Sequence, residues 1–537
     1  MTPPRGIGPR NRIARRRGPF NEGFGNDGRV LRDRLIVGAM LAGGLGLAAL
    51  EHALPDADAK VRARRHVGTV LVEIRDDADV PIPARLTFRS VGDTPKLYFT
   101  TIDIGREEVG GIAAYDRVFV LRGDCELHVP VGQYDVWVSH GPEWDTTRER
   151  IEVKPGADVE VHAKLHHVID TPGWISGDFH VHAAASLDSR VPMRDRVHQF
   201  VADGVDLIVS TDHNVIADYA PLIAELGVSD LLASATGDEI TTKTWGHFGA
   251  FPLQPEEGEL GHGAIAVSKR APAEIFADVR KHAPAALIDI HHPRLEHGDI
   301  GYFHLAGLDE KTGKATRPGF SMDFDAVEVL NGYQDADRKT LDRVVGDWIA
   351  FLDAGKRVAA TGNSDTHHLT FNLGGYPRNY VALGDVPIAK IDAAMVVTAV
   401  KAGRSYLTTG PIVDASIGGA SLGDTATVKD GKALLKLRVR AANWVSTRTI
   451  TIIGPGGAVL ATRPAPTTTS VVRFDDVIPL DFARDGYVIV RVDGDQPMAP
   501  NVGDIASWQV YPLAITNPIW VDVDGDGKIT PSRPFPP

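Results

Sequence analysis

The sequence predicts an α/β region, a distorted (β/α)7 barrel, flanked by two β-sandwich-like domains built from antiparallel strands. Two observations predict this. Strand-like segments with alternating apolar residues fill both ends of the 537-residue chain, and short apolar strands alternate with helical segments between them. We expect an export signal or signal anchor with its linker at 1–65, the first β domain at 66–171, the barrel at 172–411, the second β domain at 412–521 and an acidic terminal turn at 522–537.

Composition excludes several classes of protein. Lys and Arg number 57 against 70 Asp and Glu, which gives a net charge of −13, and no long basic run lies outside the N-terminus. We therefore expect no nucleic acid as the main partner, because duplex binding relies on neutralising phosphates. Cys125 is the single cysteine, so an intramolecular disulfide, a cysteine-rich zinc ribbon and an iron–sulfur cluster are excluded.

The N-terminus has the pattern of an export signal. Nine arginines and three acidic residues fill the first 34 positions, and an uncharged apolar run follows at 35–50. This run has 16 residues with four glycines, short of the ~20 that span a bilayer, which favours a signal peptide over a permanent membrane anchor. We expect an exported or membrane-anchored protein, periplasmic or extracellular. A buried core helix or a misplaced start codon are the alternatives.

The middle third alternates strands with helices. Apolar strand candidates such as DLIVS, AALIDI and DAVEVL are separated by helical segments. We expect helices at 194–202, 217–226, 273–282 and 336–354. Repeated alternation implies a mostly parallel sheet or barrel, in which the C-terminal ends of the strands converge on one face.

Ionisable residues stand at those strand ends. Of 20 histidines, 16 lie between His162 and His368. The strand-end residues are His180, His182, Asp212, His213, Asp238, Glu239, His291, His292, Asp365 and His367, while His247 opens a strand. Because no packing requirement repeatedly puts charge there, we interpret this set as a metal site. Isolated histidines elsewhere, such as His198, His262, His282, His297 and His304, are expected to be solvated or hydrogen-bonded structurally.

The spacing suits metal coordination. Residues i and i+2 of a strand point to the same side, so His180 and His182 can reach one ion, and Asp365 and His367 repeat the spacing. Imidazole and carboxylate suit Zn²⁺, Mn²⁺ or Fe²⁺. One ion needs about four protein ligands. The larger set here predicts two or three ions, with Glu239 as the natural bridge. Glu328 is expected either to bind metal or to orient a ligand.

The motifs resemble those of a known superfamily. GDFHVH, STDHN, GDEI followed by GHFGAF, DIHHPR, VEVLNG and GNSDTHH are similar to the successive motifs of the PHP (polymerase and histidinol phosphatase) superfamily, over about 174–411. The β domain in front, with GRSYLTTGP and ITNPIWVDVDGDG behind, resembles its CehA/McbA-type metallohydrolase branch. The resemblance implies three ion positions: the first held by His180, His182, Glu239 and Asp365, the second by Glu239, His247 and His292, the third by Asp188, His213 and His367.

One residue of this ligand set differs from the family pattern, and the choice of another depends on that pattern. Asp188 stands where many family members have histidine. The choice of His292 over His291 rests on the His-Pro pair that the family shows.

The resemblance implies hydrolysis by activated water of a small-molecule phosphoester or carboxylic or carbamic ester. We expect Glu239 and His213 at the catalytic centre, and Asp212 to orient a ligand or move protons. Arg294 and Arg378 are candidates to bind an anionic substrate, against the alternative of ordinary salt bridges. The lone Cys125 lies in the first β domain, and the G-x-S-x-G match GASLG at 419–423 lies beyond the predicted barrel, so covalent catalysis is not indicated.

A second class of function stays open, a surface protein that binds glycan or protein and keeps metal in the barrel for structure. The near-complete ligand set favours the enzyme, because a structural zinc needs four ligands and no open position. At the C-terminus, Asp522, Asp524 and Asp526 resemble the first half of a calcium loop, but position 12 is Arg533 rather than glutamate. A weak calcium site and a polar turn are the two interpretations.

Overall fold

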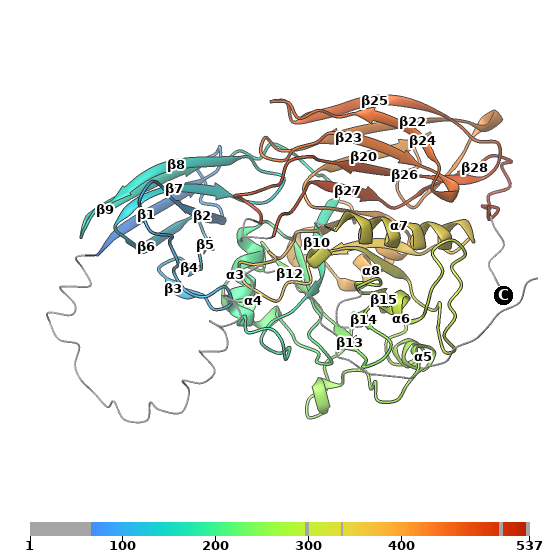
Figure 1. The fold of residues 1–537 in the computed structure, drawn as a ribbon, viewed down its shortest axis with the longest axis horizontal. Coiled ribbons are helices and arrows are strands. Elements are labelled where there is room, and N and C mark those ends of the chain that lie inside the picture. The colour runs from blue at the N-terminus through green and yellow to red at the C-terminus, as the bar shows by residue number, and fades with distance from the viewer. Residues whose placement is uncertain (1–65, 296–299, 335–336, 504–507, 533–537) are drawn as a thin grey trace, which may run out of the picture. The chain divides into compact units, whose positions relative to one another are not determined.

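The computed structural model describes residues 66–295, 300–334, 337–503 and 508–532, which belong to one compact unit (Figure 1). The apolar run at 35–50 lies outside the described residues, as does all of 1–65, where an export signal or anchor is predicted. Within the described part of the chain, no helix is both long enough and apolar enough to cross a bilayer.

The first β region consists of two sheets around one core. Alternate side chains of its first strand are buried, among them Val70, Val72 and Ile74, and they share a hydrophobic cluster with Leu86 and Val136 of the other sheet. One sheet has the order β6 (Asp124–Pro130), β1 (Val67–Arg75), β9 (Asp158–Lys164); the other has the order β3 (Arg106–Glu108), β4 (Gly111–Ala114), β5 (Arg117–Val120), β2 (Ala84–Ser90), β7 (Gly132–Ser139), β8 (Thr146–Val153).

The antiparallel arrangement predicted for this region needs one correction. β1 pairs antiparallel with β6 but parallel with β9, in a register that places Val72 opposite Val161. The reason is topological: β9 follows β8 of the other sheet and enters the first sheet in the same direction as β1.

The middle region has the predicted alternation of strands and helices. All four predicted helices are present, with ends shifted by up to a few residues. The elements are β10 (Trp174–Val181), α3 (Met193–Ala202), β11 (Leu207–Ser210), α4 (Ala220–Glu225), β12 (Ala233–Thr236), β13 (Asp238–Thr241), β14 (His247–Phe251), α5 (Pro272–His282), β15 (Leu287–Ile290), α6 (Tyr302–Leu305), β16 (Ala326–Asn331), α7 (Arg338–Asp353), β17 (Ala359–Asn363), β18 (Arg378–Ala382), α8 (Ala393–Lys401) and β19 (Ser405–Thr408).

These strands belong to two mixed sheets rather than to one continuously bonded barrel. β10, β11 and β12 are parallel to one another, as are β15, β16 and β17, whereas β14 is antiparallel to both of its neighbours. The two sheets are joined by isolated parallel bridges, Val181 to Thr366 and His213 to Glu239. Both bridges lie at the strand ends that carry the ionisable residues.

Helices cover these sheets through apolar faces. Asp337 is the N-cap of helix α7, and its side chain accepts hydrogen bonds from the backbone N–H groups of Lys339 and Thr340. Its buried residues Leu341, Val344 and Trp348 recur at helical spacing and pack in a cluster with β15 and β16. Helix α3 packs in the same way on the side of β10 and β11.

The last β region is joined to the middle one by a shared sheet. β27 pairs with β19, with Tyr406 opposite Thr516, so a single sheet runs from β12 to β24 across the boundary predicted at residue 411 (Figure 1). A second sheet has the order β20-β22-β25. The strands are β20 (Ile412–Ile417), β21 (Thr425–Thr427), β22 (Lys432–Arg440), β23 (Thr449–Ile453), β24 (Val459–Pro464), β25 (Val472–Asp481), β26 (Gly486–Asp493), β27 (Leu513–Thr516) and β28 (Ile519–Asp522).

Candidate metal centre

The predicted ligands meet at one end of the middle region. His180 and His182 come from the end of β10, Glu239 from β13, and His247 from the start of β14. The other members, Asp188, His213, His292, Asp365 and His367, lie in the loops that follow β10, β11, β15 and β17. Residues from six separate segments therefore share one site, as the convergence of strand ends predicts.

Glu239 lies at the centre of this cluster and is fully buried. Its Oε1 is 3.1 Å from Nε2 of His180, 3.2 Å from Nδ1 of His247 and 3.1 Å from Nε2 of His292. His291 adds a fourth imidazole, with Nδ1 at 3.0 Å from the same oxygen. One carboxylate oxygen has two lone pairs, so four imidazoles around it exceed what hydrogen bonding can satisfy.

Several of the converging atoms have no hydrogen bond of proper geometry. Among the described residues, these include the buried Nε2 atoms of His180 and His182, Oε2 of Glu239 and Oδ1 of Asp365. The last is 3.2 Å from the Nε2 atom of each of the two histidines. Buried polar atoms are normally hydrogen-bonded. Nitrogen and oxygen atoms that face one another without hydrogen bonds are therefore suited to hold metal cations between them.

A third cluster lies nearer to solvent. Oδ2 of Asp188 is 2.9 Å from Nε2 of His213 and 3.2 Å from Nε2 of His367. Half of the Asp188 side chain is exposed. Burial opposes ionisation of this carboxyl, but the hydrogen bonds from both histidines outweigh it and lower its pKa below the usual value. An aspartate thus occupies the position where the resemblance often has histidine, and it contacts both of the predicted co-ligands.

Four groups of potential ligand atoms result. Within each group, one atom per residue lies within 4.8 Å of all the others. The groups are His180–His182–Asp365, His180–Glu239–His292, His213–Glu239–His247 and His182–Asp188–His213–His367. Every residue predicted as a metal ligand belongs to at least one group, but His247 and His292, which were predicted to share the second ion, belong to different groups. His291, the alternative to His292, belongs to none of them and instead stacks on His180 with ring centroids 3.6 Å apart.

Burial and neighbouring charges shift the pKa values of the histidines in this cluster in opposite directions. Burial lowers the pKa of His182 well below its usual value, with a further lowering from His367. Burial also disfavours charge on His213, but Glu239 and Asp188 outweigh it and raise the pKa to about 11. The carboxylates thus draw positive charge into the site, and a divalent cation supplies that charge without protonating the ligands.

Buried polar residues hold the ligands in place. Oε1 of Glu328 is 3.1 Å from Nδ1 of His180, and its Oε2 accepts the backbone N–H of His292 at 2.7 Å. Asn331 donates to Oε2 of Glu328 and, at 3.1 Å, to Oδ2 of Asp365. Glu328 therefore matches the orienting interpretation, because it contacts the outer nitrogen of a ligand.

Two ligand positions have unusual backbone conformations. His292 has φ of 28° and Asp365 has φ of 51°, values that L-residues seldom adopt. Such strain is held by surrounding structure and is common where side chains must be aimed at a site.

The structure corrects both arginine predictions. Arg294 is buried and donates two hydrogen bonds, at 2.7 and 2.6 Å, to the carboxylate of Asp347 on α7. Arg378 is buried as well and donates to the backbone carbonyls of Asp203, Gly204 and Gly375. Neither guanidinium lines the pocket over the metal cluster, so neither is placed to bind a substrate there.

Asp212 is buried behind the site rather than in it. Its Oδ1 accepts the backbone N–H of Ala183 at 2.8 Å, which holds the segment after β10. Burial raises its pKa to about 6. Since Asp212 does not line the pocket, the prediction that it moves protons at the substrate needs correction, whereas an orienting role fits its contacts.

A pocket of about 330 Å³ opens over the cluster. Besides the predicted ligands Asp188, His213, Glu239, His247, His292, Asp365 and His367, its walls include Leu295, Ile300, Tyr333 and His368. Sequence reasoning missed Tyr333 and His368, although the first follows the strand motif VEVLNG and the second adjoins His367. His368 is held by the first β region, through Asp103, whose Oδ1 is 2.5 Å from Nδ1 of the ring. No Lys or Arg is among the described residues that line this pocket.

The C-terminal aspartates form a different group from the one predicted. Asp522 and Asp524 lie with Asp485, and Asp526 is not a member. The carboxylate of Asp522 accepts the backbone N–H groups of Gly525 and Gly527, at 2.7 and 3.1 Å. These hydrogen bonds are those of a polar turn, the alternative interpretation of this segment.

Comparisons with known proteins give only distant likeness. Neither a protein-family model nor a curated protein matches the chain. A solved structure from Bacteroides vulgatus ATCC 8482, described as a two-domain protein containing a predicted PHP-like metal-dependent phosphoesterase, has 16% identity and a TM-score of 0.33, covering 66% of this chain and 97% of its own. PsfC from Pseudomonas syringae PB-5123 has 16% identity and a TM-score of 0.27, covering 40% and 86%. Endonuclease Q, solved with a duplex substrate, has 13% identity and a TM-score of 0.26, covering 40% and 56%. TM-scores this low do not establish a shared fold or function. The assignment of the metal site therefore depends on the distances between its own residues.

Proposed function

We propose that this protein is a metal-dependent hydrolase that cleaves an ester bond with water activated at a site for two or three divalent ions. The observation that carries the proposal is the set of imidazoles around the buried carboxylate of Glu239, too many for hydrogen bonding alone. The sequence motifs support a PHP-type site of the CehA/McbA kind, built where the two mixed sheets of the middle region meet.

The described residues fit such ions in number and type. His180, His182 and Asp365 would hold one ion and His247 with His292 a second, with Glu239 between them. Asp188, His213 and His367 would hold a third. Mixed imidazole and carboxylate ligands suit Zn²⁺, Mn²⁺ or Fe²⁺.

The chain's own side chains position the reaction. When bound, divalent ions lower the pKa of water to near neutrality and polarise the oxygen of the scissile group. Glu328 and Asn331 fix the ligand side chains, so that the reacting groups are held before substrate arrives. The walls formed by Leu295, Ile300 and Tyr333 exclude water from one side and accept an apolar group of the ester.

The net charge of the metal-loaded site narrows the class of ester that it can bind. With two divalent ions bound, the three carboxylates of Asp188, Glu239 and Asp365 leave a charge of about +1, which balances a neutral or singly charged ester better than a dianion, whereas a third ion would raise this charge to about +3. A phosphate monoester would need further cations, and the described lining has no Lys or Arg. We therefore propose a carboxylic or carbamic ester or a phosphodiester as the substrate.

Three esters of different charge test this proposal in one experiment. The metal-loaded full chain would be assayed with 1-naphthyl methylcarbamate, bis-p-nitrophenyl phosphate and p-nitrophenyl phosphate, with bound metal measured on the same sample. We expect at least two ions per chain and turnover of the first or second ester well above that of the third. Preferred cleavage of p-nitrophenyl phosphate would overturn the charge argument. Bound metal without turnover of any ester would favour the alternative, a binding protein with structural metal.

We also propose that the protein is exported, a proposal that rests on the arginines and the apolar run at 35–50. A reporter active only outside the cytoplasm, fused after Leu165, is expected to be active in cells. An inactive reporter, together with activity of a second reporter that works only in the cytoplasm and is fused at the same position, would overturn the proposal.

A further inference from the structure

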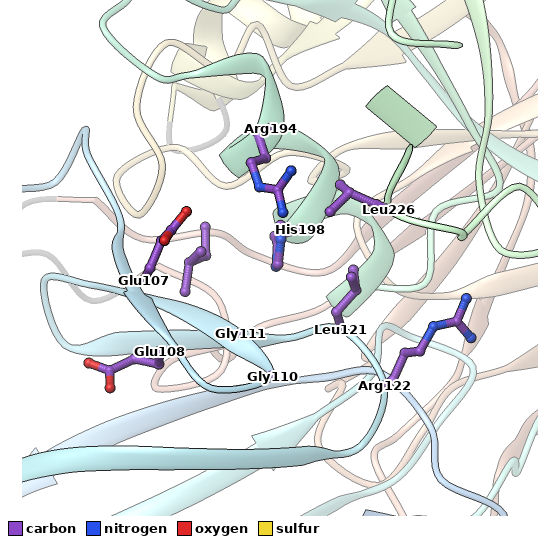
Figure 2. A pocket seen from close by; sticks show the side chains of 10 residues that line it. Glu107, Glu108, Gly110, Gly111, Leu121, Arg122, Arg194, His198 and Leu226 are labelled. Atoms are coloured by element: carbon purple, nitrogen blue, oxygen red, sulfur yellow. The ribbon is translucent and has the colours of Figure 1, made fainter. Parts of the chain in front are cut away.

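A second cavity, of about 360 Å³, lies away from the metal centre. It is enclosed on one side by the hairpin of β3 and β4 and on the other by α3 and the end of α4 (Figure 2). None of its lining residues lines the pocket over the metal cluster. A volume of this size is typical of small-molecule sites, which combine apolar walls with a few placed polar groups.

The cavity has charges of opposite sign on opposite sides. Glu107 projects from the hairpin, and its carboxylate has no ion pair or hydrogen bond with the described residues. Arg194 projects from α3 on the facing side (Figure 2). One of its nitrogens donates to Glu225 at 2.9 Å, which leaves the other N–H groups of the guanidinium for a ligand.

A buried histidine gives a second and independent indication of a ligand. His198, one turn after Arg194 on α3, is 6% exposed and points into the cavity beneath the guanidinium (Figure 2). Its Nδ1 is buried and has no hydrogen-bond partner among the described residues. The ring of His198 lines the cavity, and its unpaired Nδ1 is sealed beneath the cavity wall, where a buried polar atom without a partner is costly.

The remaining walls are apolar. Ile112 comes from β4, while Leu121 and Leu226 follow β5 and α4. The other charged side chains at the cavity have partners: Glu108 pairs with Arg106, and Arg122 donates to the backbone of Gly227. The cavity thus offers one anion, one cation and an apolar surface.

We propose that this cavity binds a small zwitterion with an apolar side group, of the class of the apolar α-amino acids. The ammonium group lies at Glu107, the carboxylate accepts from Arg194, and the side group contacts Leu121 and Leu226. Each charged end gains a charge-assisted hydrogen bond, so both charges contribute to affinity.

Calorimetric titration of the full chain tests the proposal with three probes of similar shape. L-phenylalanine has both charges, 3-phenylpropanoate lacks the ammonium group and 2-phenylethylamine lacks the carboxylate. We expect L-phenylalanine to bind about tenfold tighter than either analogue, or more, from the loss of one charge-assisted hydrogen bond. Absence of saturable binding, or equal affinity for all three, would overturn the proposal.

Two variants assign the ends of the ligand. Glu107→Gln is expected to weaken L-phenylalanine about tenfold and leave 3-phenylpropanoate unchanged, whereas Arg194→Gln weakens both and leaves 2-phenylethylamine unchanged. Both side chains are on the surface, so neither change removes part of the core. Glu149→Gln, at an exposed position of β8 outside the cavity, is the matched control. Binding by both cavity variants that equals the control would contradict the site, and neither variant is expected to alter ester hydrolysis.

Discussion

Nε2 of His180 lies 3.1 Å from Oε1 of Glu239, although the two residues are on strands of different sheets. Both side chains are fully buried. The contact is formed where β10 ends and β13 begins, so it depends on how the two sheets meet and not on any local turn. A change at Glu239 is therefore expected to affect all the ligands around it.

Glu239→Ala should lower metal content and reduce hydrolysis by roughly a thousand-fold or more, because loss of the ions removes several kcal/mol of transition-state stabilisation. Elemental analysis and ester turnover measure the two effects. Circular dichroism should show both β regions still folded. Glu149→Ala, on the exposed face of β8, is the control and should match the wild type. Full turnover in the Glu239 variant would remove its bridging role.

Glu328→Gln should weaken metal binding about 10- to 100-fold without removing a ligand, because the carboxylate that orients His180 through Nδ1 is replaced by a neutral amide. Competition with a chelator of known affinity measures the change. Glu160→Gln on β9 serves as the exposed control. An affinity equal to the wild type would mean that the contact with His180 has no orienting role.

Arg294→Ala should destabilise the fold by about 3–5 kcal/mol, because it leaves the carboxylate of Asp347 buried without its partner. Burial already raises the pKa of Asp347 to about 6 in the presence of this arginine. Urea unfolding gives the free energy. Arg438→Ala, which breaks an exposed pair with Asp475, should cost less than about 1 kcal/mol. A raised KM with unchanged stability would instead restore the substrate-binding role.

Metal affinity should rise with pH. With no cation bound, His213 has a pKa of about 11, and the pKa of His180 is raised as well, so both imidazoles hold protons at neutral pH. A bound ion must displace those protons, which costs less as pH rises, and affinity should increase about tenfold per pH unit for each proton released. Titrations between pH 6 and 8 in buffers of different ionisation enthalpy measure this. A constant affinity, with no proton release, would contradict it.

The ligand positions could be predicted because their signal is local. His180 and His182 follow from the alternation of side chains along one strand, and Glu239 and Asp365 follow from their places at strand ends. Neither kind of position requires knowledge of a distant partner. Tyr333 and His368 were missed because a pocket wall is defined by what faces it across space.

The arginines could not be placed from sequence for the same reason. Arg294 is paired with Asp347, which lies on α7, and Arg378 reaches carbonyl groups in the turn after α3. A sequence motif shows the charge of an arginine but not its partner. The parallel pairing of β1 with β9 and the shared sheet across residue 411 likewise depend on strands far apart in the chain, for which alternation gives no register.

Anomalous diffraction from crystals of the metal-loaded protein, recorded at the absorption edge of the bound metal, tests the central claim most directly. We expect two or more peaks around the carboxylate of Glu239, with His180 and His182 at one and His247 and His292 at another. No peak within coordinating distance of Glu239, or a single peak held without it, would contradict the account.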